Sequence, residues 1–158
     1  MTKHLEAMAW IEAFELGNPS IDETHREFIQ MVNALLNANA ENLDACLAAF
    51  VDHARDHFGE EDRLMAQSGY TNARCHIDEH RAVLASVEEV RGLPDDRRFI
   101  VGQRLAQELA RWFPGHLDVM DRGLVDWLVR HRTGGAPLKF MRQKPEASAG
   151  QVDSTLCV

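Results

Sequence analysis

The chain has 158 residues, of which 45% are hydrophobic, and a formal net charge of −8 at pH 7. This length fits one domain with a single core, and the acidic balance argues against a surface for nucleic acid or an anionic membrane, either of which needs a clustered basic face. Three cysteines without a CxxC pair predict free thiols and a cytoplasmic protein, and no apolar run resembles a signal peptide or a membrane span.

Four segments with helical periodicity follow an N-terminal arm at residues 1–17. Ser20 and Glu23 form a capping-box pattern, which predicts that the first helix begins there and ends near Asn37. Three further helices, separated by short turns, are expected at about 41–67, 72–91 and 95–133. A C-terminal tail is expected at 134–158. The pattern predicts an all-α fold, an antiparallel up-down four-helix bundle over residues 18–133.

Polar residues interrupt the apolar stripe of every predicted helix. His57 and Glu61 are four residues apart, as are His76 and His80, so the members of each pair share one helical face. The first and last predicted helices add one histidine each, His25 and His116. Buried polar groups without partners cost free energy, and neutral imidazoles alone cannot satisfy so many of them. The five histidines and the glutamate therefore predict a metal site in the bundle interior.

The number and type of ligands indicate the metal. With Asp121 there are seven candidate ligands, which exceed the four that a zinc ion accepts and favour two metal ions bridged by carboxylates. Imidazole with carboxylate, and without thiolate, suits iron. Asp121 lies five residues after His116, about 140° around a regular helix, so the pair requires either a local irregularity or a reach across both metals. Pro114, which lacks a backbone N–H, is a candidate cause.

The ligand spacings form a recognisable pattern: His57-xxx-Glu61, His76-xxx-His80 and His116-xxxx-Asp121, preceded by Ile21-Asp22-Glu23-Thr24-His25. This pattern resembles that of the hemerythrins, most closely the single-domain bacteriohemerythrins, and the likeness runs from about Trp10 to Arg130. The resemblance implies a non-haem diiron centre with a bridging oxo or hydroxo group. In it, one iron is bound by His76, His80 and His116, the second is bound by His25 and His57, and both are bridged by Glu61 and Asp121.

By the same resemblance, dioxygen binds reversibly at an open position of the second iron, inside an apolar wall. The wall is expected to consist of Phe28, Phe58, Trp112, Phe113, Leu117 and Met120. Phe113 and Met120 stand where branched aliphatic residues are common in the family. A dry wall keeps out the water and protons that would leave the centre in the ferric state.

The function expected from these residues is oxygen binding, for storage, delivery or sensing, rather than catalysis. The histidine-rich ligand set differs from the Glu-x-x-His pairs of ferritin-like enzymes, which favours carrying dioxygen over cleaving it. The alternatives are a diiron redox enzyme, either peroxidase-like, oxidase-like or a nitric oxide reductase, and an iron-handling protein. A protein partner for delivery or sensing would have the tail as its candidate contact.

Two further polar residues lie close to the predicted ligands in the sequence. His53, one turn before His57, is expected to be a partly exposed helix residue, with a hydrogen bond to a ligand as the alternative. Asp22, three residues before His25, is expected to act on the helix dipole, with orientation of the His25 ring as the alternative.

Overall fold

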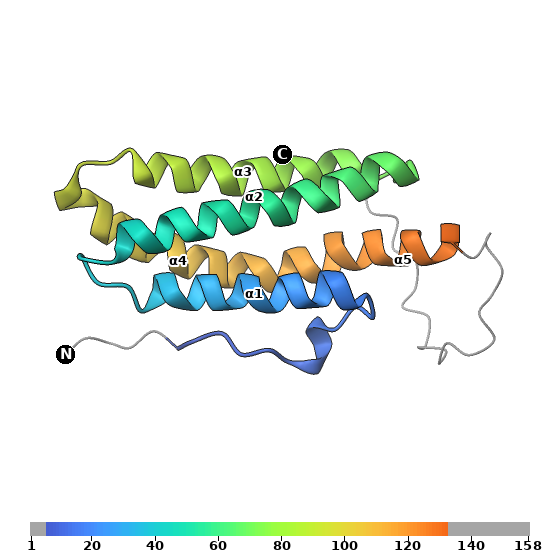
Figure 1. Ribbon diagram of the computed structural model, residues 1–158, viewed down its shortest axis with the longest axis horizontal. Helices are drawn as coiled ribbons and strands as arrows, with labels where there is room; N and C mark the ends of the chain where they lie inside the picture. The colour runs from blue at the N-terminus through green and yellow to red at the C-terminus, as the bar shows by residue number, and fades with distance from the viewer. Residues whose placement is uncertain (1–5, 133–158) are drawn as a thin grey trace.

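The computed structural model describes residues 6–132, which contain helices and turns and no strand. The elements, in chain order, are the 3₁₀ turn η1 (Glu12–Phe14), α1 (Pro19–Leu36), α2 (Leu43–Ser68), α3 (Ala73–Arg91), α4 (Asp95–His116), the π-helical turn η2 (Leu117–Asp121) and α5 (Arg122–Arg132). The first four helices lie side by side with alternating direction, and α5 extends α4 (Figure 1). The predicted all-α, antiparallel four-helix bundle is confirmed. The predicted tail lies outside the described residues.

The start of α1 differs from the prediction. The side chain of Asn18 accepts a hydrogen bond from the backbone N–H of Ile21 at 3.2 Å, and Pro19 is the first helical residue. The capping box predicted at Ser20 and Glu23 is therefore wrong. Proline suits the first position of a helix because its φ is already helical and its missing N–H would have no helical partner, so the cap moves to the residue before it.

The N-terminal arm is fastened to the start of α1 by Asp22. Its buried carboxylate accepts hydrogen bonds from the backbone N–H groups of Leu16 at 2.8 Å and Gly17 at 3.0 Å. Asp22 lies in the first turn of α1 as expected. Its oxygen atoms bind the arm, whereas His25 Nδ1 has no hydrogen-bond partner among the described residues, so Asp22 does not orient that ring.

Replacing Asp22 by alanine is expected to lower the free energy of unfolding by about 2 kcal/mol, because two N–H groups of the arm lose a buried, charged acceptor. Denaturant titration measures this as a lower midpoint at an unchanged slope. Glu23→Ala is the matched control, since the exposed Glu23 contributes one surface ion pair with Arg26 at 3.5 Å, for which we expect less than about 1 kcal/mol. Equal effects of the two variants would contradict this role of Asp22.

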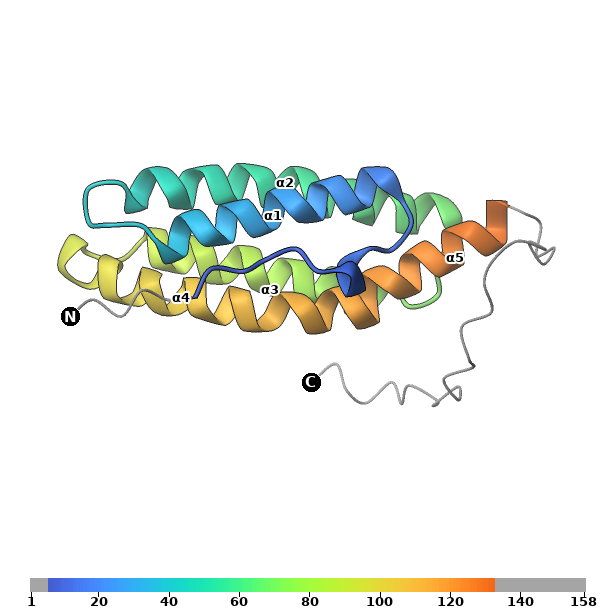
Figure 2. The same ribbon diagram turned by 90° about the horizontal axis from the view of Figure 1, so that it is seen from below.

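The arm runs along the bundle between the ribbons of α1 and α4 in the view of Figure 2. The side chain of Asn33 in α1 accepts from the backbone N–H of Met8 at 2.7 Å and donates to the Met8 carbonyl at 2.8 Å. Phe14 in η1 packs edge-on against Phe113 of α4, with ring centroids 5.8 Å apart. The arm therefore covers the core next to Phe113.

The core is divided along the length of the bundle. Near the turns that join α1 to α2 and α3 to α4, at the left end in Figure 1, the helices bury apolar side chains, including Val32, Leu35, Leu47, Phe50, Val87 and Leu109. Towards the other end the same helices bury the polar side chains. One half of the bundle thus supplies a hydrophobic core, and the other half holds the predicted ligands.

The cysteines follow the prediction only in part. Cys46 is a free thiol, as expected. Cys75 is disulfide-bonded, so the expectation of a free thiol is wrong there. An odd number of cysteines prevents all of them from pairing, but not two of them. Cys157 lies outside the described residues. Among residues 6–132, no helix combines the length and the hydropathy that crossing a membrane requires.

Candidate metal centre

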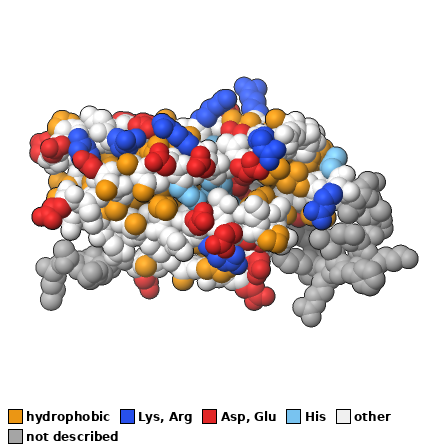
Figure 3. Space-filling view, in the orientation of Figure 1, with side chains coloured by type: hydrophobic (Ala, Val, Ile, Leu, Met, Phe, Trp, Pro, Cys, Tyr) orange, Lys and Arg blue, Asp and Glu red, His pale blue; other side chains and the backbone are white. Residues whose placement is uncertain are grey.

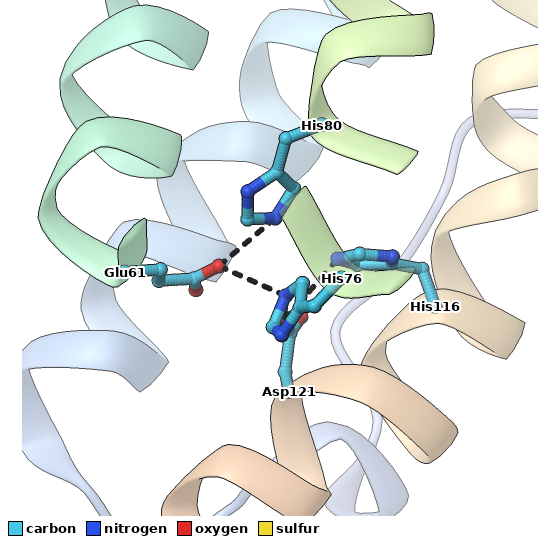
Figure 4. A group of neighbouring side chains, drawn as sticks. All are labelled: Glu61, His76, His80, His116 and Asp121. Carbon is cyan, nitrogen blue, oxygen red and sulfur yellow. Dashed lines mark ion pairs between the residues drawn. The ribbon is translucent and has the colours of Figure 1, made fainter. Parts of the chain in front are cut away.

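The seven side chains predicted as ligands meet in the interior of the bundle, and each residue is at most 5% exposed. They come from every wall of the bundle: α1 supplies His25, α2 supplies His57 and Glu61, α3 supplies His76 and His80, α4 supplies His116 and η2 supplies Asp121. Figure 4 shows five of them pointing towards one another. The sequence spacing had placed each pair on one helical face, and the fold brings the pairs together.

The π-helical turn η2 explains how Asp121 joins the group. In a regular α-helix, a five-residue separation would turn Asp121 away from His116, whereas a π turn, with hydrogen bonds from i to i+5, brings the two residues back onto one face. His116 Nε2 lies 3.2 Å from Asp121 Oδ1. The predicted irregularity is confirmed. Pro114 lies within α4, three residues before η2, and its part in causing the turn remains a prediction.

The ligand atoms form two groups that share one residue. The first group contains Glu61, His76, His80, His116 and Asp121, and the second contains His25, His57 and Glu61. Within each group, one atom of every residue lies within 4.8 Å of the others, close enough to bind a single metal ion.

Glu61 faces both groups with different oxygen atoms. Its Oε1 lies 2.9 Å from His57 Nε2 in the second group. Its Oε2 lies 3.2 Å from His80 Nε2 in the first group. A carboxylate that offers one oxygen to each of two sites has the arrangement of a bridging ligand.

Asp121 has the same arrangement. Its Oδ1 lies 2.9 Å from His76 Nε2, and its Oδ2 lies 3.0 Å from His25 Nε2. The two carboxylates therefore each span the same pair of histidine groups.

Several of these atoms lack a hydrogen-bond partner within the described part of the chain: His25 Nε2, His76 Nε2, His80 Nε2, His116 Nε2, Glu61 Oε2 and Asp121 Oδ1. They lie close together, but not in hydrogen-bonding geometry. A buried polar atom without a partner costs about 1–3 kcal/mol, so folded proteins rarely contain such a cluster. Metal ions bound to these lone pairs would satisfy all six atoms at once, so the residues fit a metal.

The electrostatics of the cluster keep its carboxylates ionised. Burial and the neighbouring Glu61 would raise the pKa of Asp121, but contacts with His116 and His25 hold that pKa well below its usual value. For His25 and His76, burial acts in the opposite direction and lowers the pKa. The carboxylates of Asp121 and Glu61 outweigh this effect of burial and raise the pKa of each histidine to about 9. Two ionised carboxylates in a buried site provide the charge that a cation needs, and cation binding would release the protons of these histidines.

Comparison with known proteins identifies the family. The family model described as the Hemerythrin HHE cation binding domain matches residues 16–128. The chain belongs to the hemerythrin family. It is 36% identical over 126 residues to a bacteriohemerythrin from Ralstonia nicotianae, covering 80% of this chain and 92% of the relative. It is 31% identical over 132 residues to a bacteriohemerythrin from Pseudomonas aeruginosa, and the match covers 78% of this chain and 82% of the relative. The predicted family is thus confirmed, and membership implies that the cation is non-haem iron.

Two carboxylates outside the predicted ligand set hold histidine rings of the hemerythrin site. Asp62 Oδ1 accepts from the Nδ1–H of His80 at 3.0 Å, and Glu79 Oε2 accepts from the Nδ1–H of His116 at 2.5 Å. The bond from His116 holds the pKa of Glu79 below its usual value. Such contacts fix the ring so that Nε2 points at the metal, and they increase its basicity. The sequence signal was present, since Asp62 adjoins Glu61 and Glu79 adjoins His80, but it was missed.

Replacing Asp62 by asparagine or Glu79 by glutamine is expected to lower the affinity for the first cation about tenfold or more, because the ring loses an anionic acceptor. Competition with a chromophoric chelator measures the change. Asp78→Asn is the matched control on α3, since Asp78 is exposed and pairs with Arg81 at the surface. Affinities equal to that of the control would show that these carboxylates do not support the site.

Four aromatic residues of the predicted oxygen wall contact histidine rings. Phe58 stacks on His80 with ring centroids 4.0 Å apart, and Trp112 stacks on His116 at 4.2 Å. The other two adjoin the second group, where Phe28 contacts His57 at 5.8 Å and Phe113 contacts His25 at 5.5 Å. Of the remaining two, Leu117 is buried and Met120 is half-buried. The structure therefore places an aromatic wall around the site, and its role in oxygen binding stays a prediction.

His53 lies beside the second ligand group. Its side chain is 11% exposed, its Nδ1 lies 3.6 Å from Glu27 Oε2, and its ring centroid lies 5.7 Å from that of His57. Burial lowers the pKa of His53, and the neighbouring His57 lowers it further. No hydrogen bond joins His53 to a predicted ligand in the described structure. It is a partly exposed helix residue, as expected, and its ring lies beside the second group.

Proposed function

We propose that this chain binds two non-haem iron ions and uses them to bind dioxygen reversibly. The observation that carries the proposal is the placement of Glu61 and Asp121, each of which offers one oxygen to each histidine group. Two bridging carboxylates call for two metal ions, and an oxo or hydroxo group is the expected third bridge.

The proposed ligands divide unequally between the two irons. The first ion would be held by three histidines and the second by only two, His25 and His57, besides the shared carboxylates. The second ion would therefore keep an open position. When bound, the iron pair supplies the electrons that reversible binding of dioxygen requires.

The protein's own contribution is to orient the ligands and to keep one side of the second ligand group dry. Phe28 and Phe113 stack on each other at 4.9 Å beside the second group, and both are at most 1% exposed. On that side, such a wall would keep protons and water away from the site. This environment supports a carrier, which must release its ligand unchanged.

A diiron redox enzyme is the second candidate function. The observation that favours it is a polar cleft of about 380 Å³ whose lining includes His57 and Glu61. Such an opening would admit small polar substrates and protons. An iron-handling role would use the same site without stable oxygen binding. We also propose that the oxygen-binding protein is cytoplasmic and serves in oxygen storage, delivery or sensing.

The deciding experiment is an optical spectrum of the iron-loaded, anaerobically reduced protein before air, after air and after argon sparging, with iron counted per chain. A visible charge-transfer band that appears in air and fades under argon, with two irons per chain, is the expected result. Rapid and irreversible oxidation without such a band would favour the enzyme. Fewer than two metals per chain would overturn the proposed centre.

A further inference from the structure

The cleft beside the second ligand group lies between α1 and α2. Its outer lining includes the exposed acids Glu27, Asp56 and Glu60, and its lining also includes His57 and Glu61, which are buried. No lysine or arginine is among the residues that line it. In Figure 3, histidine side chains reach the surface near the middle of this face, with acidic side chains close by. The cleft thus joins solvent to the proposed metal centre through acidic surroundings.

The deep residues of the cleft present polar atoms without partners. The side chains of His57 and Glu61 are at most 4% exposed. His57 Nδ1 and Glu61 Oε2 have no hydrogen-bond partner among the described residues. The other ring nitrogen, His57 Nε2, is occupied by Glu61 Oε1 at 2.9 Å. The cleft therefore ends at His57 and Glu61, two of the proposed ligands of the second group, which surface acids alone would not show.

The acids of the cleft differ in how far they are neutralised. Glu60 forms an ion pair with Arg63. Glu27 has a single contact, with His53 at 3.6 Å, and Asp56 forms no ion pair within residues 6–132. Glu27 and Asp56 therefore contribute most of the uncompensated negative charge. A cleft lined by charge of one sign concentrates ions of the other sign and raises their rate of capture.

We propose that this cleft is the opening through which a divalent cation reaches the buried centre, and that Glu27 and Asp56 accelerate its capture. The inference rests on the proposed binding of cations by the centre. The cleft between α3 and α4 is a poorer route, since its lining is mostly apolar and its half-buried carboxylate, Glu79, already accepts from His116.

The test is the rate at which the metal-free protein takes up Co²⁺, whose visible bands report coordination in stopped-flow mixing. Glu27→Gln/Asp56→Asn is expected to slow uptake about fivefold at low ionic strength, with the same final number of ions per chain. The difference should vanish in about 1 M salt, where the Debye length is about 3 Å. Glu41→Gln/Asp96→Asn removes the same charge at exposed positions outside the cleft and should leave the rate unchanged.

Two outcomes would overturn the inference, and a third would overturn the proposed function on which it rests. Equal slowing by both double variants would attribute the effect to net charge rather than to the cleft. An unchanged rate in Glu27→Lys/Asp56→Lys, which reverses the charge, would place the route elsewhere. Failure of the unmodified chain to hold Co²⁺ or Fe²⁺ at equilibrium would instead overturn the proposed function itself.

Discussion

Replacing Glu61 by alanine is expected to abolish tight binding of both irons, whereas replacing His57 by alanine should abolish binding of one. Glu61 belongs to both ligand groups, so its loss removes a ligand and a negative charge from each site. His57 belongs to the second group alone, and the five residues of the first group stay in place without it. We therefore expect about two irons per chain in the native protein, about one in His57→Ala and close to none in Glu61→Ala.

Iron analysis of the folded protein after desalting measures these ratios, with circular dichroism to verify the helical content. Glu60→Ala is the matched control, because Glu60 adjoins Glu61 in sequence but is exposed and pairs with Arg63. It should retain two irons. Full retention of both irons by Glu61→Ala would show that this carboxylate does not bridge, and complete loss in His57→Ala would show that the two sites cannot fill independently.

Removing the metal is expected to lower the melting temperature by about 10 °C. The metal-free protein keeps seven buried ionisable side chains near one another, several with unsatisfied atoms. A metal held at about a thousandfold excess over its dissociation constant adds about 4 kcal/mol to the free energy of unfolding, and each kcal/mol shifts the melting temperature by roughly 2–4 °C in a domain of this size.

Calorimetry under anaerobic conditions, with and without a chelator, measures this shift. Leu47→Ala is the control, since Leu47 is fully buried in the apolar half of the bundle. This substitution should destabilise the metal-bound and the metal-free protein by the same amount, about 2–5 kcal/mol. The difference in melting temperature between the two forms should therefore not change. Identical melting temperatures with and without metal would mean that the ligand cluster is satisfied without a cation.

The sequence predicted the bundle well because periodicity depends on local spacing. Pairs such as His76 and His80 identify their own shared face, and the helix ends at Leu36, Ser68 and Arg91 lie within one residue of those expected. The irregularity before Asp121 was also predictable, since a five-residue spacing does not fit a regular helix.

One wrong prediction, the helix cap, and several contacts that were not predicted mark the limits of local spacing. The cap lies at Asn18 because Pro19 favours the first position of α1, so the helix begins before the predicted capping box. Asp22 binds the arm, and Asp62 and Glu79 bind rings from neighbouring helices. Exposed and buried carboxylates have the same sequence signature on a helix, so only the packing of helix against helix distinguishes those that support the ligands.

The division of the core along the bundle also bears on whether the chain folds before or after it binds metal. The apolar half, with Val32, Leu47 and Val87 fully buried, contains the hydrophobic contacts that folding needs. Its amide hydrogens should exchange slowest in the metal-free chain, while those around His57 and His116 should exchange through local opening. Newly made chains would then fold first and acquire iron afterwards, so supply of the metal would control the amount of functional centre without controlling the amount of folded protein.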